Sequence, residues 1–254
     1  MTGAHPDWLG PFTLWDGGAL LWFMLAFWAT GWMVTHHPRA WSSTGELISA
    51  YRQLWMRRAA RREVRVTDIT LLATLRHGAS FLASMTVFAI GGAVALLGQI
   101  DLLESVAMSV AGGLDAPRAA QQGKTLFLIA VLAYAFLKFV WSLRVFGYCA
   151  VVMGAMPGDR EGDKEGEIER EAARAAALNR IAARNFNEGL RALYFALALL
   201  AWFLGPIALI VATTMTTAML VRREFGSETR AALRFSSFRG CAAPERLDTK
   251  REHQ

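Results

Sequence analysis

The side chains best suited to chemistry lie inside an apolar segment, where charged residues are rare. Lys138 and Arg144 interrupt the run LFLIAVLAYAFLKFVWSLRVFGYCAVV. At helical spacing Lys138 and Ser142 share one face, while Arg144 and Tyr148 lie four residues apart on a partly overlapping face. A charge at the centre of a bilayer costs at least about 2.5 to 3.5 kcal/mol, so these cations must face protein, water or a partner. They predict a site for an anion or for an acidic partner.

Two other interpretations of this cluster stay open. Lys138 can extend its four-carbon stem to the inner interface, or it can form an ion pair inside the chain, with Glu188 as the nearest candidate. A threonine stripe over Thr213, Thr216 and Thr217 follows Pro206, and a proline frees a carbonyl one turn earlier. Such a broken helix beside the third predicted span could line a cavity, as in transporters. The candidate site comprises Lys138, Ser142, Arg144, Tyr148, Thr213 and Thr217.

No known catalytic signature occurs in the chain, and its carboxylates avoid the apolar runs. His36, His37 and His77 are isolated at the edges of predicted spans, and Cys149 and Cys241 show no metal-ligand or redox spacing. We therefore expect no enzyme, no metal site and no cofactor.

The elements that must position these residues are membrane-spanning helices. Of 254 residues, 54% are hydrophobic and only 19% are charged, and the apolar residues gather in long charge-free blocks. A helix needs about 20 apolar residues to cross a bilayer. The chain is therefore predicted to be an all-α integral membrane bundle, with residues 1–225 forming one membrane domain. The predicted spans are 17–34, 78–97, 125–147, 187–204 and 206–221.

The last apolar block, 192–221, can be divided in two ways. As one straight helix it would be about 45 Å long, about half as long again as the hydrocarbon core. Gly205 and Pro206 near its middle allow either one kinked helix, giving four spans, or a hairpin, giving five. Only five spans put all three arginine-rich segments on one side of the membrane. We therefore expect five spans in the inner membrane, with the N-terminus outside and the polar, disordered tail 226–254 in the cytoplasm.

The segment 51–65, YRQLWMRRAARREVR, predicts a basic amphipathic helix. Its arginines gather on one side, away from Trp55, Met56 and Ala59, which suits a helix lying on anionic lipid headgroups. An acidic partner or nucleic acid is the alternative, but no nucleic-acid motif accompanies the charge. The predicted lipid-facing patch is Arg57, Arg58, Arg61, Arg62 and Arg65. Residues 158–185 are rich in Ala, Glu and Arg and predict a solvated helix that leads into the fourth span.

Small residues recur along the second predicted span, 78–97, and include Ala79, Ala83, Gly91, Gly92 and Ala95. Small residues four apart let a neighbouring helix approach closely. We expect this face to pack within the chain, with self-association as the alternative.

Three separated stretches resemble a family of bacterial and plant membrane proteins, the domain of unknown function 599 family. They are FLASMTVFAIGG at 81–92, FVWSLRVFGYCAVVMGAMP at 139–157, and the stretch from RNFNEGLRALYFALALLAWFLGP to VRREF at 184–225. The resemblance implies a multi-pass membrane protein and supplies no activity, substrate or cofactor. Gly147 stands where many members have Asn. Gly205 stands where some bacterial members have His.

Two functions follow from these features. The first is a membrane scaffold or accessory subunit that binds other membrane proteins or a second copy of itself. The alternative is an anion channel or transporter built on Lys138, Arg144 and the threonine-lined cavity. A membrane enzyme ranks third.

Overall fold

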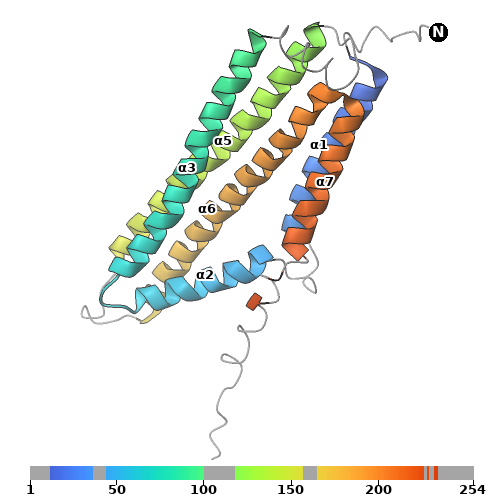
Figure 1. Ribbon diagram of the computed structural model, residues 1–254. Coiled ribbons are helices and arrows are strands. Elements are labelled where there is room, and N and C mark those ends of the chain that lie inside the picture. The colour runs from blue at the N-terminus through green and yellow to red at the C-terminus, as the bar shows by residue number, and fades with distance from the viewer. Residues whose placement is uncertain are drawn as a thin grey trace, which may run out of the picture.

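The computed structural model describes residues 12–36, 44–99, 118–156 and 165–225, together with 228, 232 and 233. Within these residues the fold is all-helical, as predicted (Figure 1). The elements are α1 (Leu14–His36), α2 (Thr44–Ala60), α3 (Val66–Leu97), α5 (Arg118–Ala155), α6 (Glu165–Leu200), the short 3₁₀ helix η3 (Ala201–Leu204) and α7 (Pro206–Phe225). The predicted tail, 226–254, lies almost wholly outside the described residues.

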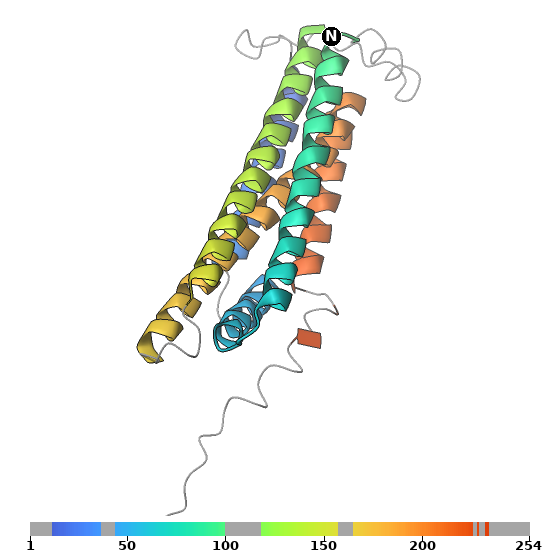
Figure 2. The same ribbon diagram turned by 90° about the vertical axis from the view of Figure 1, so that its left-hand side faces the viewer.

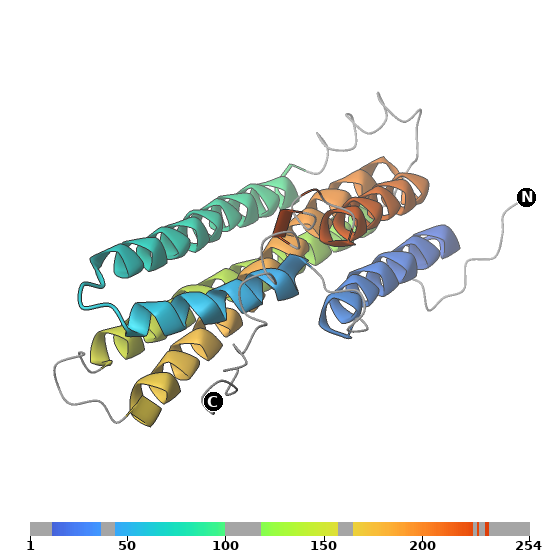
Figure 3. The same ribbon diagram turned by 90° about the horizontal axis from the view of Figure 1, so that it is seen from below.

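The long helices of the described chain, α1, α3, α5, α6 and α7, lie side by side, and α2 lies across one end of the bundle (Figures 1 and 2). We call this the α2 end, and the opposite end, where α6 passes into η3, the η3 end. Helix α5 packs against α3 and α6, while α7 packs against α1 and α6. Figure 3, which looks from the α2 end, shows α2 lying across the near end of the bundle, and Figure 1 shows α1 and α7 on one side of α6 and α3 on the other.

In the part of the chain that the structure describes, three helices are long and apolar enough to cross a membrane: α1, α3 and α5. The charged residues Arg184, Glu188 and Arg191 interrupt the apolar pattern of α6, and Arg222 and Arg223 follow an apolar stretch of only 16 residues in α7. Because α6 and α7 run alongside the three apolar helices, they belong to the same bundle.

The last apolar block forms a hairpin rather than one kinked helix. Helix α6 ends at Leu200, η3 continues to Leu204, and α7 starts at Pro206 and runs back along the bundle (Figure 1). Gly205 has φ 126°, which is strained for any residue with a Cβ, so glycine suits this reversal. Pro206 stands at the first position of α7, where its missing N–H leaves no intrahelical hydrogen bond unmade.

Among the described residues, three apolar clusters hold the bundle together: one toward each end, and a smaller one around Phe139 of α5. Toward the η3 end, aromatic rings join α1 to its neighbours: Phe23 packs edge-to-face on Phe127 of α5 and on Phe195 of α6. At the α2 end, a separate core includes Met56 of α2, Leu72 of α3 and Met153 of α5, together with Ala172 and Ala175 of α6. The α2 end is therefore a small helical domain with its own core, continuous with the bundle.

Candidate binding sites at the helix interfaces

Lys138 and Glu188 form an ion pair between α5 and α6. The Lys138 Nζ lies 2.5 Å from a carboxylate oxygen of Glu188, and the two side chains are 28% and 19% exposed. The ammonium also lies 5.4 Å from the centre of the Tyr134 ring, and Arg184 approaches the second carboxylate oxygen at 3.7 Å. The internal pairing considered from the sequence is thus confirmed.

Glycine 189 explains how α6 comes close enough for this pair to form. A Cβ at this position would lie 2.9 Å from Phe139 Cε1 and 3.2 Å from the carbonyl oxygen of Ala135. Both contacts are tighter than side chains ordinarily allow, so only glycine lets α6 rest on this part of α5. One turn further along α5, the hydroxyl of Ser142 donates a 2.8 Å hydrogen bond to the carbonyl of Ala182. Ser142 therefore fixes the α5–α6 contact and faces protein.

The remaining predicted site residues do not gather around Lys138. Arg144 and Tyr148 are exposed on α5. Thr213 is fully buried on α7, which packs against α1 and α6, whereas α5 packs against α3 and α6. Because α7 and α5 do not pack against each other, the threonines and Lys138 do not line one cavity.

Two members of the threonine stripe differ from their neighbour Thr214 in hydrogen bonding. Thr214 donates to the Ile210 carbonyl of its own helix at 2.7 Å, as threonines in apolar helices commonly do. The hydroxyl oxygens of Thr213 and Thr217 are buried and make no hydrogen bond within the described part of the chain.

The basic helix differs from its prediction in length and in orientation. Helix α2 ends at Ala60, so Arg61, Arg62 and Arg65 lie in the turn before α3. Its apolar face, with Met56 0% and Ala59 1% exposed, packs on protein and not on lipid. The prediction of a single lipid-facing helix over 51–65 was therefore wrong in both respects, because α6 and α5 supply an apolar surface that the sequence pattern alone does not reveal.

Three of the five predicted patch arginines bind within the protein. Arg57 pairs with Glu169 at 2.9 Å, and Arg62 pairs with the buried Asp68 at 2.8 Å. Arg65 donates to the carbonyls of Met153 and Met156. Arg58 and Arg61 remain exposed.

The interior of the α2 end also holds a polar contact. Arg52 of α2 donates a hydrogen bond to the side-chain oxygen of Asn179, which is fully buried on α6. Burial lowers the pKa of the Arg52 guanidinium. The contact ties α2 to α6.

A buried ionic cluster at the η3 end was not predicted. Asp16 of α1 accepts a 2.7 Å hydrogen bond from the Trp202 indole and lies 3.6 Å from the Lys124 Nζ. Lys124 also donates to the Trp202 carbonyl at 3.2 Å. All three residues are at most 7% exposed. The cluster joins α1, α5 and η3, which are far apart in sequence. Its only signal in the sequence was a charge directly before two predicted spans, Asp16 before 17–34 and Lys124 before 125–147.

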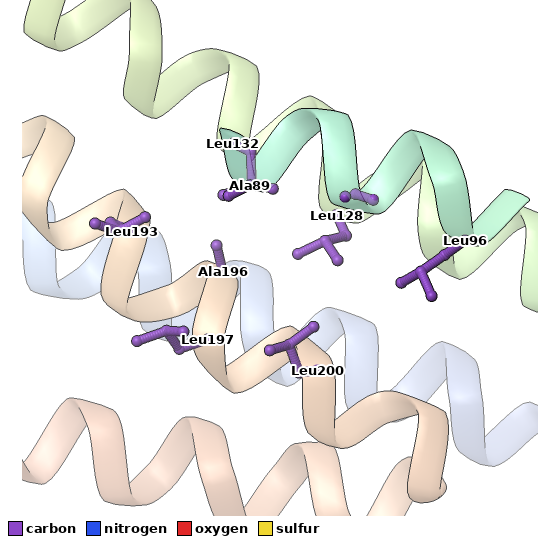
Figure 4. A pocket seen from close by; sticks show the side chains of 10 residues that line it. Ala89, Leu96, Leu128, Leu132, Leu193, Ala196, Leu197 and Leu200 are labelled. Atoms are coloured by element: carbon purple, nitrogen blue, oxygen red, sulfur yellow. The ribbon is translucent and has the colours of Figure 1, made fainter. Parts of the chain in front are cut away.

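The face of α3 toward the η3 end is partly unoccupied. Ala79 and Ala83 are buried, and Ala83 packs against α5 and α6, as expected for packing within the chain. A Cβ added at Gly91 or Gly92 would meet nothing within 4 Å. Beside them, a pocket of about 250 Å³ opens between α3, α5 and α6, lined only by alanine, leucine and glycine (Figure 4). Leu96, Leu128 and Leu200 point into it.

Among the described residues, no group of three or more His, Cys, Asp or Glu side chains could hold a metal ion. His77 is exposed, and its ring nitrogen contacts the Ala73 carbonyl of its own helix. His37 lies outside the described residues.

Comparison with known proteins gives one match. A family described as "Protein of unknown function, DUF599" matches residues 18–229. No curated protein and no solved structure matches the chain.

Proposed function

The chain belongs to the DUF599 family of unknown function, and we propose that this member is a membrane scaffold or accessory subunit that docks a helix of another membrane protein on α3. The docking face consists of Phe88, Gly91, Gly92 and Ala95, all exposed, next to the apolar pocket.

The two unoccupied glycines carry this proposal. A glycine inside a helix costs about 1 kcal/mol relative to alanine, and here no side chain of the described chain uses the space that the glycines leave. In a membrane, small residues favour association because they let two backbones approach closely. An external helix in contact with Gly91 and Gly92 accounts for both glycines, and the adjacent pocket would receive one of its side chains.

Orientation completes the proposal. We place the α2 end in the cytoplasm and the N-terminus outside, with five crossings of the inner membrane. The exposed Arg58, Arg61, Arg222 and Arg223 all belong to the α2 end, where anionic headgroups and the positive-inside rule favour them.

Photo-crosslinking in native membranes tests the docking face. Phe88 is 72% exposed, and Trp28 on α1 is a matched aromatic control at 70% exposure. With benzoylphenylalanine at position 88, we expect a discrete adduct with one membrane protein or with a second copy of this chain. The same probe at position 28 should give no such adduct.

A blocking substitution makes the test specific. Gly91→Leu should leave the fold intact, because nothing lies within 4 Å of the new Cβ, yet it should remove the adduct at position 88. Equal adducts from both positions, or an adduct that persists in Gly91→Leu, would contradict the proposal.

Anion transport is the second candidate function. It is favoured by an excess of cations in one region of the α5–α6 interface, where Lys138 and Arg184 share the single carboxylate of Glu188. It ranks second because the pocket described above is apolar and lies on another part of the interface.

A further inference from the structure

Arg191 lies near the ion pair between α5 and α6 but forms no direct ion pair with Glu188. It lies one turn after Glu188 on α6, and both Lys138 and Arg184 already contact that carboxylate. The Arg191 guanidinium packs over the Phe27 ring of α1, with 5.7 Å between its central carbon and the ring centre. Within residues 12–36, 44–99, 118–156 and 165–225 it makes no hydrogen bond and no ion pair, and its Nε is buried.

Such a guanidinium lacks the acceptors that it needs. Arginine carries five N–H donors and stays charged, and an unpaired charge is costly in an apolar environment. The ring of Phe27 offers only a cation–π contact, which leaves the planar fork of N–H groups unused. An anion with two or more oxygens would satisfy that fork through paired hydrogen bonds.

The α1 backbone holds the guanidinium in place. Gly31 of α1 faces Arg191, and a Cβ at Gly31 would lie only 3.0 Å from a terminal guanidinium nitrogen. Glycine at this position therefore allows the fork to rest against the α1 backbone. Lys138, Arg184 and Arg191 all lie near the single carboxylate of Glu188, which contacts only the first two directly, so the surroundings remain net positive.

The Arg191 side chain is long enough to reach toward the lipid headgroups, if Gly205 marks the opposite boundary of the hydrocarbon core. It precedes Gly205 by 14 residues, which is about 21 Å of helix. In a hydrocarbon core about 30 Å thick, its Cα then lies about 9 Å from the boundary nearer α2, and an arginine side chain spans most of that distance. Basic pockets between helices at this boundary are suited to phosphate-bearing headgroups.

We propose that Arg191, seated between Phe27 and Gly31, binds a phosphate group at the α2 side of the membrane. The group belongs either to the headgroup of an anionic phospholipid or to free phosphate. This site is independent of the docking face on α3 and lies on the opposite side of α6 from it.

Native mass spectrometry of the purified full-length chain, in detergent and phosphate-free buffer, tests the site. The probes are phosphatidylglycerol, diacylglycerol with the same acyl chains, and inorganic phosphate. We expect wild-type protein to retain one phosphatidylglycerol and no diacylglycerol. Arg191→Gln should weaken phosphatidylglycerol binding by about tenfold or more, as expected for loss of charge-assisted hydrogen bonds. Arg180→Gln, which removes an exposed arginine from the same helix, should change it by less than twofold.

A second variant keeps the outcome decisive if Arg191→Gln fails to fold. Gly31→Val retains the arginine but displaces its fork, so it should weaken binding as well. Displacement of the lipid by inorganic phosphate would identify free phosphate as a ligand, and failure to displace it would identify the lipid. The proposal is overturned if neither probe binds, if Arg191→Gln or Gly31→Val binds like the wild type, or if Arg180→Gln loses as much affinity as Arg191→Gln.

Discussion

Replacing Asp16 with alanine is expected to lower the free energy of unfolding by about 3–5 kcal/mol, the largest effect of any single substitution considered for this chain. Asp16 faces the Lys124 ammonium and accepts the Trp202 indole N–H at 2.7 Å, and each of these residues is at most 7% exposed. Without the carboxylate, a buried ammonium remains uncompensated and an indole N–H loses its acceptor. Because the cluster joins α1, α5 and η3, the bundle should loosen first at the η3 end.

Two further variants separate the charge from the packing. The unfolding midpoint in detergent, followed by circular dichroism, should fall clearly for Asp16→Ala and for Lys124→Ala. The double variant Asp16→Leu with Lys124→Met removes both charges and should recover a large part of the loss, because apolar residues can replace a buried pair at little cost. If Asp16→Ala unfolds at the wild-type midpoint, the cluster does not stabilise the bundle.

The second large effect concerns the pair between Lys138 and Glu188. Lys138→Ala should destabilise the protein by about 3 kcal/mol, since it removes the closest cation of Glu188 and leaves the more distant Arg184 and Arg191. Exchange of the two charges, Lys138→Glu with Glu188→Lys, should restore part of this loss. Arg144→Ala removes an exposed cation from the same helix and should shift stability by no more than about 0.5 kcal/mol.

The same proteins distinguish the two candidate functions. Reconstituted in liposomes, wild-type protein should show no anion flux if it is a scaffold. Flux that appears in the wild type and disappears in Lys138→Ala would favour transport, whereas equal loss of stability from Lys138→Ala and Glu188→Ala without any flux would assign the pair to structure alone. The midpoint of unfolding, measured alongside flux, separates loss of function from loss of fold.

The parts of the fold that depend on local pattern could be predicted. Charge-free runs predicted most of the bundle helices. The length of 192–221 with Gly205 and Pro206 allowed a kinked helix or a hairpin, and the distribution of arginines selected the hairpin. The pairing of Lys138 with Glu188 was one of three interpretations, and only the contact between α5 and α6 selected it. Gly189, whose missing side chain allows this contact, looks in the sequence like any other helical glycine.

What depends on distant segments could not be predicted. Asp16 and Lys124 are 108 residues apart, and each alone resembles an ordinary charge at the end of a span. The apolar face of α2 has the composition of a lipid-binding surface, and only the approach of α5 and α6 shows that it packs on protein. The contact of the Arg191 guanidinium with the Phe27 ring, in place of a direct ion pair, emerges only when α1 and α6 are placed side by side.

Thiol labelling of spheroplasts tests the five-crossing arrangement most directly. Cys149 is fully buried, so Cys241 is the natural target for a membrane-impermeant maleimide near the C-terminus, and Ser109→Cys in a Cys241→Ser background probes the connection between α3 and α5. With five crossings and the arginine-rich segments inside, we expect labelling at position 109 in intact spheroplasts and labelling of Cys241 only after lysis. Labelling of Cys241 in intact spheroplasts would contradict the arrangement.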